Sequence, residues 1–101
     1  MNLQDTINEA LEIPVVKDGD KKLPLDQVVV DTYDERHRYG TDWVTEYNYV
    51  SKQSLSKEEF ENKIKEAGME PVGMIYEPRK RKLTMANGDV YYRHILKTAM
   101  F

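Results

Sequence analysis

Apolar and β-branched residues alternate with polar ones over residues 27–33 and 43–50, with the period of two that is typical of half-buried strands. In the first stretch Val28, Val30 and Thr32 share one face. In the second stretch one face carries Trp43, Thr45, Tyr47 and Tyr49. We therefore predict two strands. The polar residues between them, 34–42, are expected to form a long loop of the kind that often carries function.

The period changes to that of an α-helix in two other places. Near the start of the chain, apolar residues recur at intervals of three and four and predict a short helix that ends before Pro14. Those residues are Leu3, Ile7, Ala10 and Leu11.

The second helix has clear signals at both ends. Ser56 and Glu59 have the spacing of a capping box, and Leu55 and Phe60 have that of a hydrophobic staple. Gly68 stands where a C-terminal glycine cap is expected, after the apolar stripe. We predict a helix between these two caps.

Two dipeptides predict hairpins with type I′ turns, Asp18-Gly19 and Asn87-Gly88. With Asn87 and Gly88 as a two-residue loop, Leu83 lies opposite Tyr92 and Arg81 lies opposite His94. One face of this hairpin is then a core face, with Leu83, Met85, Val90, Tyr92 and Leu96. The other face carries Thr84, Lys82 and Lys80 across from Tyr91, Arg93 and Ile95.

A further strand is predicted over residues 70–77, with Glu77-Pro78 turning the chain into the second hairpin. Three successive strands with short connections predict an antiparallel meander. We therefore expect residues 1–101 to form one α+β domain. Its antiparallel sheet would have about five strands, with one or two helices on one face.

Composition narrows the class of protein. The net charge is −3 and there is no cysteine, which excludes disulfides and thiolate metal sites. No apolar run approaches the length of a membrane helix, and the first residues lack the pattern of a signal peptide. We expect a cytoplasmic protein without membrane contact.

The second hairpin offers a candidate binding surface made of Lys80, Lys82, Tyr91 and Arg93. Like charges directly opposite each other, as Lys82 and Arg93 are in this register, cost stability unless an anion or acidic partner lies over them. Lys and Arg would neutralise phosphates or carboxylates, and Tyr91 would stack on a base or fill a partner's pocket. The alternative is a solvated face, with lysines guarding an edge strand.

The polar segment 34–42 contains the second candidate set, Arg36, His37, Arg38 and Tyr39. Arg and Tyr are enriched among the residues that dominate binding energy at protein interfaces. The alternative is an exposed polar loop with no partner.

Catalytic patterns are absent from the sequence. Neither His37 nor His94 lies in a recognisable motif, and there is no glycine-rich phosphate loop. Asp18 and Asp20 lack the glycine and glutamate positions of a calcium loop. We expect no catalytic residue, no metal and no cofactor, and keep an enzyme whose site forms only in three dimensions as the less favoured alternative.

The preferred hypothesis is a small non-enzymatic binding protein, an inhibitor or adaptor that acts on a protein partner. The short, cysteine-free, Tyr-rich chain has the general character of small phage and mobile-element proteins that block host proteins. The alternative is a small nucleic-acid-binding protein that uses the basic hairpin face. The apolar residues Ala99, Met100 and Phe101 leave a homodimer open beside a monomer.

Overall fold

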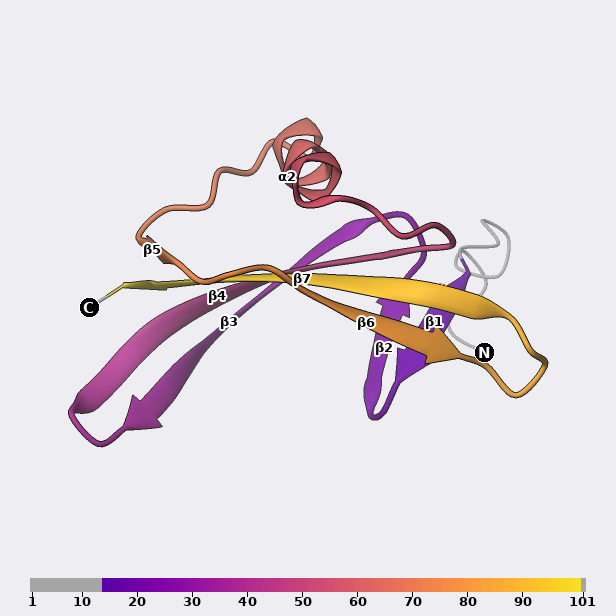
Figure 1. The fold of residues 1–101 in the computed structure, drawn as a ribbon. Helices are drawn as coiled ribbons and strands as arrows, with labels where there is room; N and C mark the ends of the chain where they lie inside the picture. The colour runs from indigo at the N-terminus through magenta and orange to yellow at the C-terminus, as the bar shows by residue number, and fades with distance from the viewer. Residues whose placement is uncertain (1–13, 101) are drawn as a thin grey trace, which may run out of the picture.

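The computed structural model describes residues 14–100, which fold into three layers (Figure 1). A five-stranded sheet lies in the middle, helix α2 covers one face, and the β1–β2 hairpin covers part of the other. The elements in chain order are β1 (Val15–Asp18), β2 (Lys21–Pro24), β3 (Val28–His37), β4 (Gly40–Ser51), α2 (Lys57–Glu66), β5 (Met74–Ile75), β6 (Arg79–Thr84) and β7 (Val90–Met100). The predicted α+β class is confirmed. The short helix predicted before Pro14 lies outside the described residues.

Strand β7 is the centre of the sheet. On one side it pairs with β4, which pairs with β3, and on its other side it pairs with both β5 and β6. The predicted three-stranded meander is therefore wrong, because β5 and β6 follow one another along a single edge. Ile75 pairs with Thr98 and Arg79 with Ile95, so the edge path has one residue more than β7 over this interval. Glu77-Pro78 forms that bulge rather than a turn, at a place where the missing proline N–H is tolerated.

The long loop predicted over residues 34–42 is also wrong. Strands β3 and β4 pair without a break as far as His37 and Gly40, which leaves only Arg38 and Tyr39 as the turn. Most side chains of this arm are exposed, and the backbone ladder alone satisfies its polar groups. A strand with both faces in water needs no alternation of apolar residues, so the sequence pattern gave no strand signal there.

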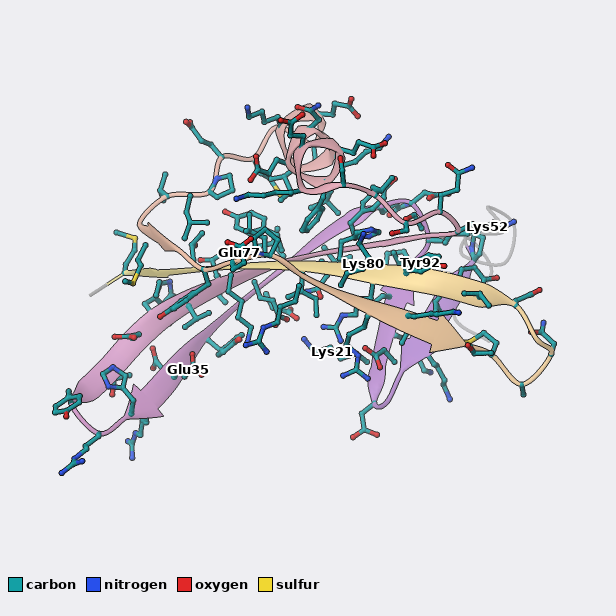
Figure 2. All side chains as sticks on the ribbon, in the orientation of Figure 1. Lys21, Glu35, Lys52, Glu77, Lys80 and Tyr92 are labelled. Atoms are coloured by element: carbon teal, nitrogen blue, oxygen red, sulfur yellow. The ribbon has the colours of Figure 1, made fainter. Side chains whose placement is uncertain are left out.

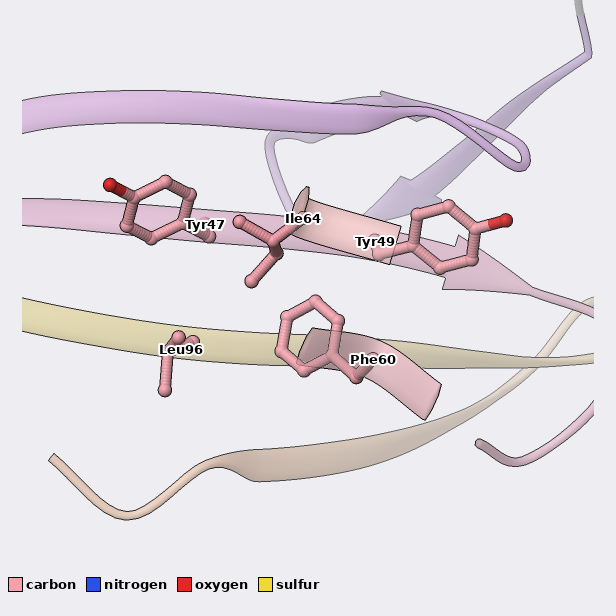
Figure 3. Close-up of a cluster of buried hydrophobic side chains, with 5 residues drawn as sticks. All are labelled: Tyr47, Tyr49, Phe60, Ile64 and Leu96. Carbon is pink, nitrogen blue, oxygen red and sulfur yellow. The ribbon is translucent and has the colours of Figure 1, made fainter. Parts of the chain in front are cut away.

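Helix α2 has the predicted ends. The capping box of Ser56 and Glu59 is formed, and at the other end Gly68 N–H donates to Lys65 O while Met69 N–H donates to Ile64 O. Through this helix the first core cluster forms on one face of the sheet, which we call the helix face (Figure 3). The cluster consists of Tyr47, Tyr49, Phe60, Ile64 and Leu96.

The opposite face of the sheet, here called the hairpin face, carries a separate core cluster under β1 and β2. It consists of Val16, Leu23, Val50 and Leu83. The predicted small hairpin is confirmed, but its loop is Gly19-Asp20 and only Gly19 has a positive φ, as in a type II′ turn. Each face of the sheet thus has its own small core.

The register of the β6–β7 hairpin differs by one residue from the prediction. Leu83 lies opposite Tyr91, and Arg81 lies opposite Arg93. The loop has three residues, because Met85 N–H donates to Asp89 O and Gly88 N–H closes a turn onto Met85 O. The Asn87 side chain accepts from Asp89 N–H, which stabilises this loop without a left-handed Asn87. The extra loop residue shifts β6 by one position along β7 relative to the predicted register. Each β6 side chain therefore shares a face with β7 side chains that the prediction had placed on the opposite face.

Candidate functional site

The observed register distributes the predicted hairpin surface over both faces of the sheet. Lys80 and Lys82 lie opposite His94 and Tyr92 on the helix face, whereas Arg93 is on the hairpin face. Tyr91 is also on the hairpin face and packs against the core under β1 and β2. The four residues Lys80, Lys82, Tyr91 and Arg93 therefore do not form one surface, and the predicted repulsion between Lys82 and Arg93 is absent.

Arg93 is buried in an ion-pair network that ties the β1–β2 hairpin to the sheet. Its guanidinium donates to Asp18 Oδ2 at 2.7 Å and to Asn48 Oδ1 at 2.8 Å. Arg81 lies across from Arg93, and Asp18 Oδ1 accepts this second guanidinium at 3.2 Å. One carboxylate therefore bridges two arginines that would otherwise repel each other.

Glu46 is the second buried carboxylate of the network. It accepts from Lys21 Nζ at 2.8 Å and from the Asn48 amide at 3.1 Å, with Arg93 and Lys97 slightly farther away. Burial raises the pKa of Glu46, but these hydrogen bonds and positive charges outweigh it and leave the pKa below its ordinary value. The same hydrogen bond is the main reason that the pKa of Lys21 is raised. Both groups are charged at neutral pH.

The second predicted set lies at the tip of the β3–β4 arm. Arg36 and His37 end β3, and Arg38 and Tyr39 form the turn, with Tyr39 86% exposed. His37 Nε2 lies 3.1 Å from Asp42 Oδ1, and the Arg38 guanidinium stacks over the Tyr39 ring. Figure 1 shows this tip and the β6–β7 turn at opposite ends of the molecule, so the two predicted sets are not brought together.

His94 is a buried structural residue. Its side chain is 2% exposed and lies between the sheet and helix α2, against the ring of Phe60. The Leu55 N–H donates to Nε2 at 3.0 Å, so the ring proton is on Nδ1, which donates to Tyr49 O at 3.0 Å. Burial lowers the pKa of His94, and the charge of Lys80 lowers it further. The imidazole is neutral and links the helix to the sheet.

The hairpin face holds a groove between the β1–β2 hairpin and the β3–β4 arm. Its two lobes each have a volume of about 590 Å³ and share Arg79, Ile95 and Lys97. Figure 2 shows Lys21 and Glu35 on the two opposite walls. We call the lobe beside Lys21 the basic lobe and the lobe beside Glu35 the acidic lobe. The acidic lobe is lined by Glu35, His37, Asp42, Tyr76 and Glu77.

The exposed apolar side chains gather at the other notable surface, the end of the sheet where β5 meets the last residues of β7. Trp43 pairs with Met100 of β7 on one side, and on the other side Ile75 pairs with Thr98, two positions before Met100 along β7. Both faces of β5 are apolar, since Met74 and Tyr76 point opposite to Ile75. We call this set the apolar end; its members are Trp43, Val72, Met74, Ile75, Tyr76 and Met100, which are 39–56% exposed.

The two segments of the edge differ in how they are protected. Strand β6 carries four consecutive cationic residues, Arg79–Lys82, and such charges discourage the addition of another strand. Strand β5 has none. The Tyr76 N–H donates inward to Lys97 O, so the N–H and C=O of Ile75 point to the open side. An unprotected, apolar edge therefore lies beside a protected one. The predicted meander did not indicate this edge, because in a meander residues 70–77 pair with residues 79–84 and not with β7.

Two features are absent from the described residues. Within residues 14–100 no three His, Asp or Glu side chains lie close enough together to hold a metal ion. In the same part of the chain no helix is long and apolar enough to cross a membrane. The apolar end presents the outward backbone groups of Ile75 and a cluster of exposed apolar side chains.

Comparisons with protein-family models, with curated proteins and with solved structures found no match to this chain.

Proposed function

We propose that the protein is a small binding module, an inhibitor or adaptor, that captures a protein partner at the apolar end. The observation that supports the proposal most is the unprotected edge of β5 within a cluster of exposed apolar side chains. An edge strand of this kind accepts an additional strand through backbone hydrogen bonds, while alternate side chains of the incoming segment fill apolar contacts on each face. Tyr76, directly after β5, supplies a large aromatic contact of the kind that typically dominates such binding, and Trp43 adds exposed apolar area two strands farther into the sheet.

The charges beside the edge indicate the chemistry of the partner. Glu77 follows Tyr76 directly, and it lines the acidic lobe together with Glu35 and Asp42. These carboxylates favour a cationic side chain at one end of the bound segment and disfavour an acidic one. The partner segment is therefore an extended, alternately apolar stretch with a flanking Lys or Arg.

Peptide selection tests this proposal. A displayed library of random dodecamers is selected on the full chain, and the enriched peptides are titrated against Ile75→Lys and Val15→Lys. Ile75 and Val15 are both 55% exposed on strands, but only Ile75 belongs to the apolar end. We expect apolar peptides with a basic flank, and a loss of affinity of about tenfold or more in Ile75→Lys, equivalent to the loss of about 1.4 kcal/mol of binding energy.

Equal affinity of the selected peptides for both variants would contradict the proposal. Sedimentation of the unliganded protein provides a second check. Self-association that Ile75→Lys abolishes would assign the apolar end to a second copy of this chain instead of a different protein.

The four residues that suggested the nucleic-acid alternative do not form the open surface that it requires. Lys80 and Lys82 lie on the helix face, and Lys80 Nζ donates to Ser54 Oγ at 2.6 Å. Arg93 is engaged with Asp18 and Asn48, and Tyr91 packs on the core. A stacking and phosphate-binding surface needs these groups together on one open face.

A further inference from the structure

The basic lobe of the groove gathers more positive charge than its carboxylates balance. Five cationic side chains line it, those of Lys21, Arg79, Arg81, Arg93 and Lys97. Three carboxylates are paired with them, Asp18, Asp31 and Glu46. Lys80 also borders the lobe, but its side chain is on the helix face, where its ammonium group donates to Ser54 Oγ, so it is left out of this count. The basic lobe thus has a surplus of two positive charges, and two of its cations, Arg79 and Lys97, also line the acidic lobe.

The surplus is concentrated at Arg79. Among residues 14–100, no carboxylate forms an ion pair with this guanidinium, whereas Arg81, Arg93, Lys21 and Lys97 each have at least one. Arg79 lies directly opposite Ile95, whose neighbours on the same face of β7 are Arg93 and Lys97. Arg79 and Arg81 point the same way from β6, roughly 7 Å apart along the strand. The cations thus surround a small apolar floor.

From this geometry we propose that the basic lobe binds phosphate with a total of two or more negative charges, carried by one phosphate group or by two neighbouring ones. Two guanidinium groups at this spacing each offer a planar pair of N–H donors, which matches phosphate oxygens. A single carboxylate would leave the lobe with a net positive charge, whereas a diphosphate or a phosphate monoester neutralises it. The neighbouring acidic lobe repels anions and so confines the phosphate to the basic lobe.

The volume of the basic lobe, about 590 Å³, exceeds that of an inorganic anion. The two charges can therefore belong to the terminal phosphate of a small phosphorylated molecule, or to two successive phosphodiesters of a single-stranded nucleic acid, which carry one negative charge each. Both sources present the same chemistry to Arg79 and Arg81. This site is separate from the apolar end and does not depend on the protein-binding proposal.

Calorimetric titration at fixed ionic strength tests the site, with inorganic pyrophosphate in one arm and a deoxythymidine decamer in the other. The key variant is Arg79→Gln, and the matched control is Lys82→Gln. Both remove one exposed cation from β6, but their side chains point to opposite faces of the sheet. Neither side chain is part of the buried network, so both variants are expected to fold.

We expect binding in at least one arm, weakened about tenfold or more by Arg79→Gln and little changed by Lys82→Gln, as for the loss of hydrogen bonds to a charged group. Pyrophosphate binding identifies a small phosphorylated ligand, and decamer binding without pyrophosphate binding identifies a nucleic-acid backbone. No binding in either arm, or equal weakening by both variants, would overturn the site. Ile75→Lys should bind as the unmodified chain does, which separates failure here from failure at the apolar end.

Discussion

His94 shows how one buried side chain connects two layers of the molecule. Its two ring nitrogens have opposite roles, since Nε2 accepts from the first residues before α2 and Nδ1 donates to β4. A second proton on the ring would have to displace the Leu55 N–H from Nε2. The neutral tautomer is therefore required for the helix to remain docked.

This requirement predicts a pH dependence of stability. Burial, and then the charge of Lys80, lower the pKa of His94 in the folded state below the value of about 6.5 expected in the unfolded chain. The unfolded chain then binds more protons as the pH falls below that value, so the free energy of unfolding decreases with falling pH. We expect urea denaturation to show lower stability at pH 5.5 than at pH 7.5, and a smaller difference in His94→Gln.

Gln can accept and donate at the two sites of His94 but does not titrate in this range. His37→Gln, at the exposed tip of the β3–β4 arm, is the matched control and should keep the pH dependence. An unchanged pH dependence in His94→Gln would assign it to other groups.

The contacts of individual residues also explain which parts of the fold could be predicted from the sequence and which could not. Helix α2 could be predicted because its caps are local, with Ser56 and Glu59 three positions apart. The register of β6 and β7 could not, because Arg93 binds Asp18, which precedes it by 75 positions. That partner places Arg93 on the hairpin face, and the loop at Asn87 adapts to the result.

At the scale of elements, β5 depends on a close approach between two backbones. Gly73 has φ of +91°, and a Cβ there would lie 2.6 Å from the Ala99 carbonyl oxygen of β7. Any other residue must move away from β7 at this point. The glycine therefore holds the start of β5 against the sheet.

We expect Gly73→Ala to separate β5 from β7. The N–H of Tyr76, which donates to Lys97 O, should then exchange faster with solvent by hydrogen-exchange NMR. Gly88→Ala is the matched control, because its φ of +93° is almost the same but no atom lies within 4 Å of the added Cβ. Both variants carry the strain of a left-handed conformation, about 1–2 kcal/mol, and only Gly73→Ala adds a clash. Equal protection of Tyr76 in both variants would show that β5 tolerates the contact.

The elements on the hairpin face were the least predictable part of the candidate sites. The exposed arm formed by residues 34–42 has no apolar alternation, so only tertiary structure shows that it is a wall of the groove. Arg79 and Arg81 were visible as a basic run, but the assumed register gave them no common face with Lys97. A binding site built from three strands and a hairpin has no linear signature.

At the scale of the whole molecule, stability is concentrated in the middle of the sheet. Val44 and Val50 on β4 and Leu96 on β7 are almost fully buried, whereas the β3–β4 arm extends beyond both core clusters. We expect the backbone amides of Tyr47 and Leu96 to exchange slowest with solvent, near the rate set by global unfolding. Amides at Glu35 and Thr41 should exchange much faster. Similar protection of both groups would contradict the division into a stable centre and a peripheral arm.

The central place of β7 has a consequence for protein synthesis. A ribosome that has added residues only as far as 89 has produced β4 with β3 beside it, but neither core cluster has the strand that completes it. Without β7, helix α2 lacks its contact with Leu96. Leu83 on β6 likewise lacks the strand that carries its partner, Tyr91. The nascent chain must therefore keep an incomplete half-sheet in solution until residues 90–100 have left the exit tunnel. Folding of residues 14–100 therefore waits for β7, and the emergence of this strand decides when the sheet first becomes a folded unit.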